Sequence, residues 1–371
     1  MANSFVTLKT IARQALPRLI DNLVFPSLVY RDFSEEMHDV GDTVMVRRPT
    51  AFTAEEFNAE SGVNYQDMND DVVDVTLEHL ATVDARASAI ETATCIDDLN
   101  RAFVEPAAAA LAEKINRDGL KLYADIPYVV GSAGTTPSTL ADLSDVRKKL
   151  NENRVPQSGR VAVWDIEADA KLTQIPALVN AEKSGSTNAL REGSFGRVYG
   201  IDHYMSQGVV KHVSGIVAAS NVKVSGAVQK GAISLNIEGT TLTGCFTRGD
   251  LIRIAGNTYT VVSDSTMASG NVISGITVYP ALPAVADKTA VVLIGNHTAN
   301  LAFHPMAFAY VTRPLANPDG QGVQSYVTSY NGISLRVTKG YDQRYKRTTY
   351  SMDVLYGFKT VYPELAVRTL G

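Results

Sequence analysis

The chain has 371 residues, of which 45% are hydrophobic and 20% are charged, a composition typical of a soluble protein with two or three folded units. It carries no run of about eighteen apolar residues, so a membrane-spanning helix is excluded. Arg13 and Arg18 interrupt the apolar positions that a signal peptide would need, so we expect a cytoplasmic product. The formal net charge of −5 argues against a protein that grips nucleic acid along its surface.

Residues 1–42 are expected to form an N-terminal arm. Short helical periods alternate there with Pro17 and Pro26, and the segment FPSLVYRDF has the pattern of extended chain with isolated apolar anchors. Such a segment cannot bury its own apolar groups. We therefore expect it to lie on another surface, of this chain or of a neighbour, or else to fray.

Residues 43–84 predict a long β-hairpin with a wide tip, built from the strands TVMVRRPTAF and DVVDVTLEHLATVD. In the second strand Val73, Val75 and Leu77 alternate with polar residues, which indicates one apolar face. Residues 51–85 hold nine carboxylates and no Lys or Arg. Their scattered spacing lacks the order of a calcium loop, so a solvated face or a face that meets a basic partner is favoured over a metal site.

Residues 94–125 carry the clearest helical period in the chain, with apolar side chains at steps of three and four. Thr94 is a suitable N-cap, and the AAAALAEK segment has high intrinsic helix propensity. Pro106 interrupts the pattern. Either the helix is kinked there, or a short helix ends and the main helix begins at Glu105 with proline in its first turn. We expect a long helix within residues 85–127.

A mixed α/β unit is expected over residues 128–221, with helices at Leu140–Leu150 and Ile166–Asn180 on either side of the strand RVAVW. From about Asn221 the composition changes to Gly, Val, Ser and Thr without a helical period. We predict a separate all-β barrel or sandwich over residues 222–299, inserted because α/β-type sequence resumes afterwards. Its six expected strands are VKVSG, AISLNI, DLIRIAG, TYTVVS, ISGITVYP and AVVLIG.

The last part of the chain contains a hairpin, QSYVTSY-NG-ISLRVTKGYD, in which Asn331–Gly332 is the strongest short-range turn signal. From Arg313 onward there are eight basic and four acidic residues. Patches of opposite charge on one chain suit association between copies, although each single residue is equally compatible with a solvated charge. The predicted contacts between copies are Arg47, Arg48, Glu55, Glu56, Glu60, Asp67, Asp70, Asp71, Arg344, Lys346 and Arg347.

No motif in the sequence carries recognisable chemistry. The six histidines are dispersed, and there is no nucleophile elbow, phosphate loop or dinucleotide-binding fingerprint. Arg248–Gly249–Asp250 matches an adhesion tripeptide, but in a turn between β-segments we expect this to be coincidence. We expect no catalytic residue, no metal site and no cofactor, and hence no enzyme.

Several segments in a fixed order carry a resemblance to a known family. They are FVEPAAAALAEKI in the long helix, GSFGRVYGIDHYMSQ in the mixed unit, FTRGDLIRIAGNTY in the insertion, then NLAFHPMAFAYVTRPL, GISLRVTKGYD and MDVLYGFKTVYPELAVR. Together they resemble a tailed-phage major capsid (coat) protein of the Hong Kong 97 fold, in the podovirus-type group that carries an inserted β-barrel. The resemblance covers nearly the whole chain.

The resemblance implies an α+β fold. Residues 43–84 would be the extended loop that reaches over a neighbouring subunit, and residues 85–127 the spine helix of a peripheral domain. An axial domain would occupy residues 128–221 and 300–330, and residues 331–371 would supply the C-terminal strands of the peripheral domain. In a shell that changes curvature, Pro106 would be a hinge in the spine.

The resemblance also implies function and partners. Copies would assemble into hexamers and pentamers of an icosahedral virion shell in the bacterial host cytoplasm, around double-stranded DNA held without sequence-specific binding and without a membrane. Because the chain begins directly with the arm, we expect a separate scaffolding protein, together with a portal. The type member joins its subunits through a loop lysine, but this chain has no lysine between Lys9 and Lys114, so we expect no such cross-link.

Two other classes of protein remain open from the residues alone. One is a phage tail or adhesion protein in which the β insertion binds a receptor. The other is a hydrolase or transferase with a β accessory domain.

Overall fold

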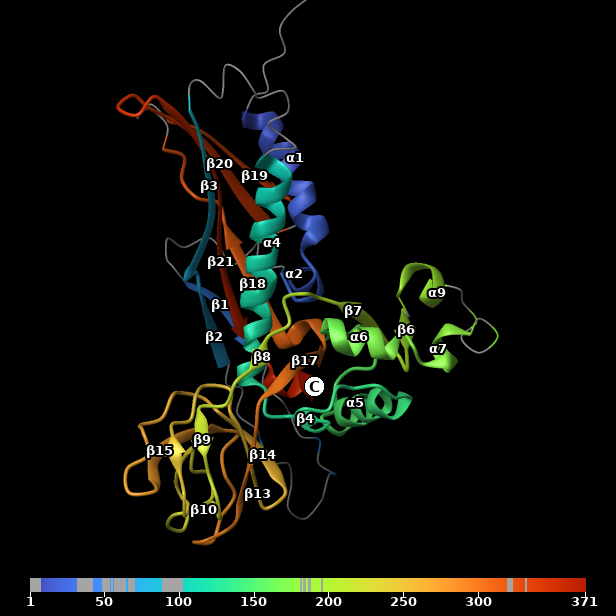
Figure 1. Cartoon of the computed structure of the whole chain (residues 1–371), viewed down its shortest axis with the longest axis vertical. Helices are drawn as coiled ribbons and strands as arrows, with labels where there is room; N and C mark the ends of the chain where they lie inside the picture. The colour runs from blue at the N-terminus through green and yellow to red at the C-terminus, as the bar shows by residue number, and fades with distance from the viewer. Residues whose placement is uncertain are drawn as a thin grey trace, which may run out of the picture. The chain divides into compact units, whose positions relative to one another are not determined.

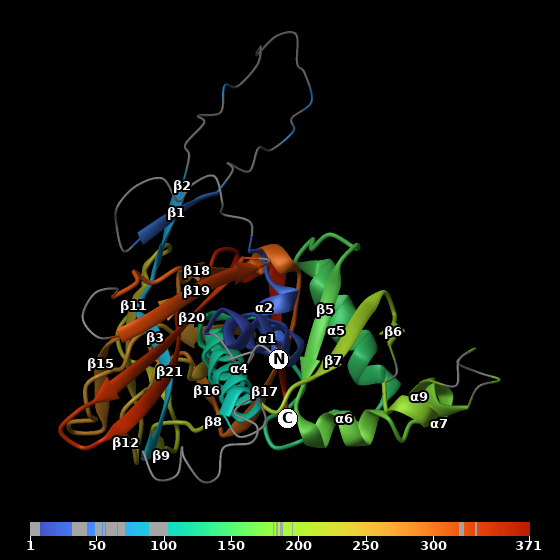
Figure 2. The same cartoon turned by 90° about the horizontal axis from the view of Figure 1, so that it is seen from above.

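The structure is a computed structural model, shown in two views in Figures 1 and 2. It describes residues 8–31, 43–48, 54, 56, 65, 71–88, 103–180, 182, 185, 188–194, 196–318, 323–330 and 332–371. The chain divides into two compact units. The first comprises Met1–Leu16, Arg31–Ile96 and Ala309–Val361, and the second comprises Pro17–Tyr30, Asp97–Phe308 and Tyr362–Gly371.

The first unit is built on a five-stranded antiparallel sheet with the order β18-β21-β20-β19, in which β3 pairs with the other edge of β21. The predicted hairpin forms, because Tyr330 is paired with Ile333 and Gly332 takes a left-handed φ of +73°. Asn331 lies outside the described residues. Much of β20 and β21 is buried, including Leu335, Val337 and Met352. The strands are β3 (His79–Ser88), β18 (Phe308–Arg313), β19 (Val323–Tyr330), β20 (Ile333–Asp342) and β21 (Arg347–Thr360).

A separate two-stranded ladder joins β1 (Thr43–Arg48) to β2 (Asp71–Thr76), as the sequence predicts for the base of the hairpin. Val75 is fully buried, which agrees with the predicted apolar face. The single long strand predicted after the tip is wrong. The chain leaves the ladder after Thr76 and begins β3 at His79, because β3 pairs with β21 instead of with β1.

The N-terminal part is more helical than predicted. α1 (Leu8–Asn22) contains Pro17, and α2 (Phe25–Leu28) replaces the extended chain expected there. Phe25 is fully buried, with its ring centre 5.5 Å from that of Phe303 and 5.6 Å from that of Phe308. This apolar anchor therefore packs on its own chain.

The long helix of the second unit is α4 (Glu105–Leu120), which continues as the 3-10 helix η2 (Lys121–Asp125). Its buried side chains include Leu111 and Ile115, the face that the apolar period predicts. Pro106 lies in the first turn of α4, directly after a π-helical turn at Phe103 and Val104. The choice between the two predicted arrangements depends on the residues before Phe103 and stays a prediction. Residues 89–102, where the rest of the predicted helix falls, lie outside the described residues.

The second unit has a seven-stranded mixed sheet in the order β4-β22-β17-β5-β7-β6, with β8 paired to β17. Within it β4 runs parallel to β22 and β5 runs parallel to β7. The strands are β4 (Val129–Val130), β5 (Arg160–Trp164), β6 (Arg197–Val198), β7 (Ile201–Met205), β8 (Lys211–His212), β17 (His297–Phe303) and β22 (Ala366–Leu370).

Helices α5 and α6 pack on this sheet, as Figure 1 shows, because Leu143, Val146 and Leu172 share one core with Trp164 and Val367. α5 begins with a capping box between Thr139 and Asp142. The single helix predicted over Ile166–Asn180 is instead broken, since Pro176 disfavours a helical conformation in the residue before it. The helices are α5 (Leu140–Glu152), α6 (Ile166–Leu172), α7 (Pro176–Val179) and α9 (Asn188–Glu192), and two 3-10 turns are η3 (Pro305–Ala307) and η4 (Pro363–Leu365).

The β insertion has a six-stranded antiparallel sheet in the order β10-β11-β15-β14-β13-β16, and all six predicted strands form. Bonds from the Val224 N–H to the Thr289 carbonyl (2.9 Å) and from the Val291 N–H to the Val222 carbonyl (3.0 Å) link the two ends of this order. A short ladder joins β9 to β12. The strands are β9 (Ile216–Ala218), β10 (Lys223–Val224), β11 (Ser234–Glu238), β12 (Thr243–Gly244), β13 (Leu251–Ile254), β14 (Asn257–Val261), β15 (Val272–Tyr279) and β16 (Val291–Ile294).

Three predicted boundaries differ from the structure. Residues 85–88, assigned to the long helix, belong to strand β3. Ala299, the predicted end of the insertion, lies inside β17 of the mixed sheet. The last strand, β22, also belongs to the mixed sheet, whereas β18 and β19 belong to the first unit. Composition marks where a β region starts but does not reveal which sheet a strand joins.

Candidate functional site

The predicted contact residues of the β1–β2 ladder are placed only in part. Arg47 and Arg48 lie in β1, and Arg48 is in register with Asp71 of β2. Glu56 is exposed. The backbone register of the ladder therefore pairs two of the predicted contact residues within the same chain. The other predicted acids lie outside the described residues: Glu55, Glu60, Asp67 and Asp70.

The predicted basic residues Arg344, Lys346 and Arg347 lie together at the turn between β20 and β21. The guanidinium carbons of Arg344 and Arg347 lie 5.4 Å and 5.6 Å from the centre of the Tyr345 ring. The Asp342 carboxylate accepts hydrogen bonds from the N–H groups of Arg344 (2.9 Å) and Tyr345 (3.3 Å). Tyr345 is 57% exposed. The turn thus presents a cationic cluster around one ring, and such contacts are worth about 0.5–1 kcal/mol at exposed sites.

Pro106 lies on a groove of about 550 Å³ within the second unit, which Asn116, Met205 and Gly208 also line. Proline is well tolerated in the first turn of a helix, so Pro106 breaks no backbone hydrogen bond inside the described part of α4. The described part of α4 therefore gives no support to a hinge made by a missing hydrogen bond. The hinge stays a prediction.

A buried polar cluster that the sequence did not predict joins Tyr123 of η2, His212 of β8 and Asp250 at the start of β13. The Tyr123 hydroxyl lies 3.0 Å from His212 Nδ1, and His212 Nε2 lies 2.8 Å from Asp250 Oδ1. Thr247 donates its N–H (2.7 Å) and its hydroxyl (3.3 Å) to Asp250 Oδ2. Burial raises the pKa of Tyr123. The hydroxyl therefore keeps its proton. Because a carboxylate only accepts, His212 Nε2–H donates to Asp250, and the tautomer of His212 decides which way the bond to Tyr123 runs.

Arg368 of β22 completes this cluster. Its guanidinium carbon lies 4.4 Å from the centre of the Tyr123 ring, and its NH1 group donates to the Gly249 carbonyl at 2.8 Å. The side chain is fully buried, and burial lowers its pKa to about 9. The His297 ring lies beside that of His212, with ring centres 5.2 Å apart and the planes tilted by 41°. Burial, together with the charge of Arg368, lowers the pKa of His297 to about 3. His297 is therefore neutral at physiological pH.

The cluster has the order of a catalytic relay but lacks access for a substrate. His212 and Asp250 are 3% and 2% exposed, so no reacting group from solvent reaches them in this state. Among the described residues no three His, Cys, Asp or Glu side chains are grouped to hold a metal ion. The described helices include none that is both long and apolar enough to cross a membrane. The geometry suits a structural cluster that holds η2, β8 and β13 together.

Sequence spacing did not reveal this cluster because its members lie far apart in the chain. One available signal was Arg368, the only charged residue in the final strand AVRTL, which also holds three apolar residues. A charged residue at a position with a buried strand pattern usually has a buried partner.

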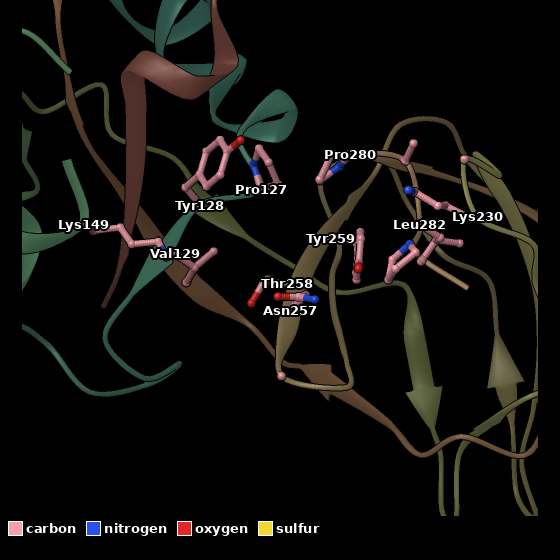
Figure 3. A pocket seen from close by; sticks show the side chains of 14 residues that line it. Pro127, Tyr128, Val129, Lys149, Lys230, Asn257, Thr258, Tyr259, Pro280 and Leu282 are labelled. Atoms are coloured by element: carbon pink, nitrogen blue, oxygen red, sulfur yellow. The ribbon is translucent and has the colours of Figure 1, made fainter. Parts of the chain in front are cut away.

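An open cavity of about 560 Å³ lies between the β insertion and the mixed sheet of the second unit (Figure 3). Tyr128 and Lys149 approach from one side, and Thr258, Tyr259 and Leu282 approach from the other. Lys149 already pairs with Glu152 at 3.1 Å. Its lining combines three prolines, two tyrosines and small or apolar residues with the polar Lys149, Lys230, Asn257 and Thr258, and it contains no His, Cys, Asp or Glu.

No family model matches the chain, and no curated protein matches its sequence. Among solved structures, its fold is similar to one titled Mycobacterium phage Che8, with a TM-score of 0.55 and 17% identity over 94% of this chain and 90% of that chain. It is also similar to the capsid structure of the Cyanophage P-SCSP1u, with a TM-score of 0.52 and 12% identity over 94% of this chain and 88% of that chain. At such identities the likeness is one of fold. The chain has a mixed α+β fold of the kind found in phage capsid structures.

Proposed function

We propose that this chain is the major shell-forming protein of a tailed phage, many copies of which assemble into hexamers and pentamers of an icosahedral capsid around double-stranded DNA. The observation that supports this most strongly is the fold likeness to a phage capsid structure over 94% of the chain. The absence of a converging substrate site among the described residues fits a protein that works through its interfaces.

In this proposal the elements take the roles that the resemblance implies. The β1–β2 ladder is the base of an extended loop that reaches a neighbouring subunit, and α4 is the spine helix. The linked six-stranded sheet is the inserted barrel of the podovirus-type group. A two-stranded ladder is marginally stable alone in water, so a loop of this kind gains stability from the surface on which it lies.

Charge gives the proposed contacts their orientation. The acidic segment of residues 51–85 and the cationic cluster around Tyr345 suit each other on different copies. Complementary potentials of this kind fix partner and register more than they add affinity. The net charge of −5 suits a container whose DNA must be packed and later released, because tight phosphate binding would oppose both steps. A separate scaffolding protein and a portal are the proposed partners in assembly.

Negative-stain microscopy of the purified protein, produced with and without the other structural proteins of its phage, tests the proposal. Closed shells or five- and six-fold clusters support it. Tubes would instead indicate a tail protein. A small monodisperse particle under both conditions would contradict assembly and would instead indicate an enzyme or a binding protein.

A further inference from the structure

Three consecutive residues of the β insertion, Arg248, Gly249 and Asp250, all contact other parts of the second unit. They form the turn that leads into β13. The turn is held inside the insertion by a bond from the Gly249 N–H to the Val261 carbonyl (2.8 Å) and by one from the Arg248 N–H to Asp264 Oδ1 (2.8 Å). The Arg248 side chain, the Gly249 carbonyl and the Oδ1 atom of Asp250 in addition contact partners outside the insertion.

The outer partner of the turn is η2, the continuation of α4. Arg248 forms an ion pair with Asp125 at 2.6 Å. Next to the turn, the Thr260 hydroxyl of β14 donates to the Ala124 carbonyl at 2.7 Å, and Thr260 is fully buried. The insertion thus holds η2 both by charge at the rim and by a hydrogen bond in the interior.

Gly249 shows how close this contact is. A Cβ at this position would lie 2.9 Å from the Ala124 Cβ and 3.1 Å from the Ala124 Cα. The residue also has a φ of +91°, a conformation that L side chains rarely adopt. Its carbonyl accepts the bond from Arg368. Only glycine lets the turn approach both η2 and β22.

Asp250 reaches furthest into the unit. Through its carboxylate the insertion contacts His212 of β8, and His212 in turn contacts Tyr123 of η2. Arg368 lies over the same Tyr123 ring. One carboxylate therefore connects the insertion with the mixed sheet and with the end of α4, at a depth where leaving a charge or hydrogen-bonding group unpaired is costly.

We propose that the Arg248–Gly249–Asp250 turn is a latch that locks the β insertion to the end of α4 through the Asp250–His212–Tyr123 relay and Arg368. The insertion swings away from the mixed sheet only when the relay breaks. While the relay holds, the insertion and η2 move together. The tripeptide is an internal docking element, and its buried aspartate is not available to a receptor in the locked state.

Hydrogen exchange resolved by mass spectrometry on the full chain tests the latch. Asp250→Ala removes the central carboxylate. Glu238→Gln is the matched control, because Glu238 pairs with Lys288 inside the insertion at 2.6 Å and does not belong to the relay. Tyr123→Phe removes only the outer bond of the relay, and it serves as the decisive variant if Asp250→Ala does not fold.

Asp250→Ala is expected to raise the amide hydrogen exchange rates of segments 121–127, 246–252 and 258–262 by about tenfold or more. The loss of a hydrogen bond to a charged group would produce a change of this size. Exchange in the β11–β15 ladder is expected to stay within about twofold, as it should throughout Glu238→Gln. Tyr123→Phe should give a smaller rise in the same segments. A uniform rise across the second unit, or no rise at the junction in either relay variant, would overturn the proposal.

Discussion

The hydrogen bond between Trp164 and His203 makes the free energy of unfolding of the second unit depend on pH, and the structure predicts the direction of this dependence. Trp164 is the one tryptophan of the chain, and its Nε1–H donates to His203 Nδ1 at 2.9 Å. An indole N–H only donates, so His203 Nδ1 carries no proton. Burial lowers the pKa of His203 from its ordinary value of 6.5 to about 4. Protonation would remove the acceptor from Trp164.

The sign and size of the effect follow from linkage. The unfolded chain binds a proton at His203 near pH 6.5, whereas the native chain binds it only near pH 4. The stability that the neutral imidazole confers is therefore complete above pH 6.5 and is lost as the pH falls toward 4. Each pH unit in this window is worth about 1.4 kcal/mol, which amounts to about 3 kcal/mol over the window.

Urea unfolding followed by Trp164 fluorescence measures this slope between about pH 6 and pH 5. In His203→Asn the amide oxygen still accepts from Trp164 but does not titrate in this range. The slope of the unfolding free energy against pH should fall by about 1.4 kcal/mol per pH unit relative to the parent. The same replacement at His79, which is exposed in the first unit, is the control. Equal slopes in the parent and in His203→Asn would refute the reasoning.

Three further predictions concern single parts of the chain. The β insertion should fold alone, because its sheet encloses its own core. A fragment of residues 216–294, which includes β9 and stops before β17, should give a β-type circular dichroism spectrum. A random-coil spectrum of this fragment would count against the prediction. Assembled particles should run as monomers on an SDS gel, because no lysine lies between Lys9 and Lys114, and a ladder of covalent oligomers would disprove this. Pro106→Ala should change the free energy of unfolding by no more than about 1 kcal/mol, because the residue lies in the first turn of α4. It should nevertheless alter the size or the expansion of the particles. Particles of unchanged size and expansion would contradict a hinge at Pro106.

Local patterns predicted much of the secondary structure. The six strands of the insertion, the buried face of α4 and the Asn331–Gly332 hairpin each depend on periods or turn residues within about a dozen positions, which sequence displays directly. The expected helices at Leu140 and Ile166 form for the same reason, although Pro176 divides the second. The resemblance was informative about fold because the order of these elements is itself a pattern.

Long-range pairing was not predictable in the same way. The strand after Thr76 pairs with β21 and not with β1. The last strand, β22, joins the mixed sheet although it follows directly after the first unit in sequence. The buried cluster brings together Tyr123, His212, Asp250 and Arg368, which are far apart in the sequence. No spacing rule connects such residues, so their function as a joint appears only in three dimensions.

A cryo-electron microscopy reconstruction of particles formed by this protein tests the central claim most directly. The proposal predicts a closed icosahedral shell whose pentamers and hexamers are built from this chain, with the β1–β2 ladder of each copy against a neighbouring copy. A reconstruction in which this chain forms tubes, or attaches to a shell made by another protein, would contradict it.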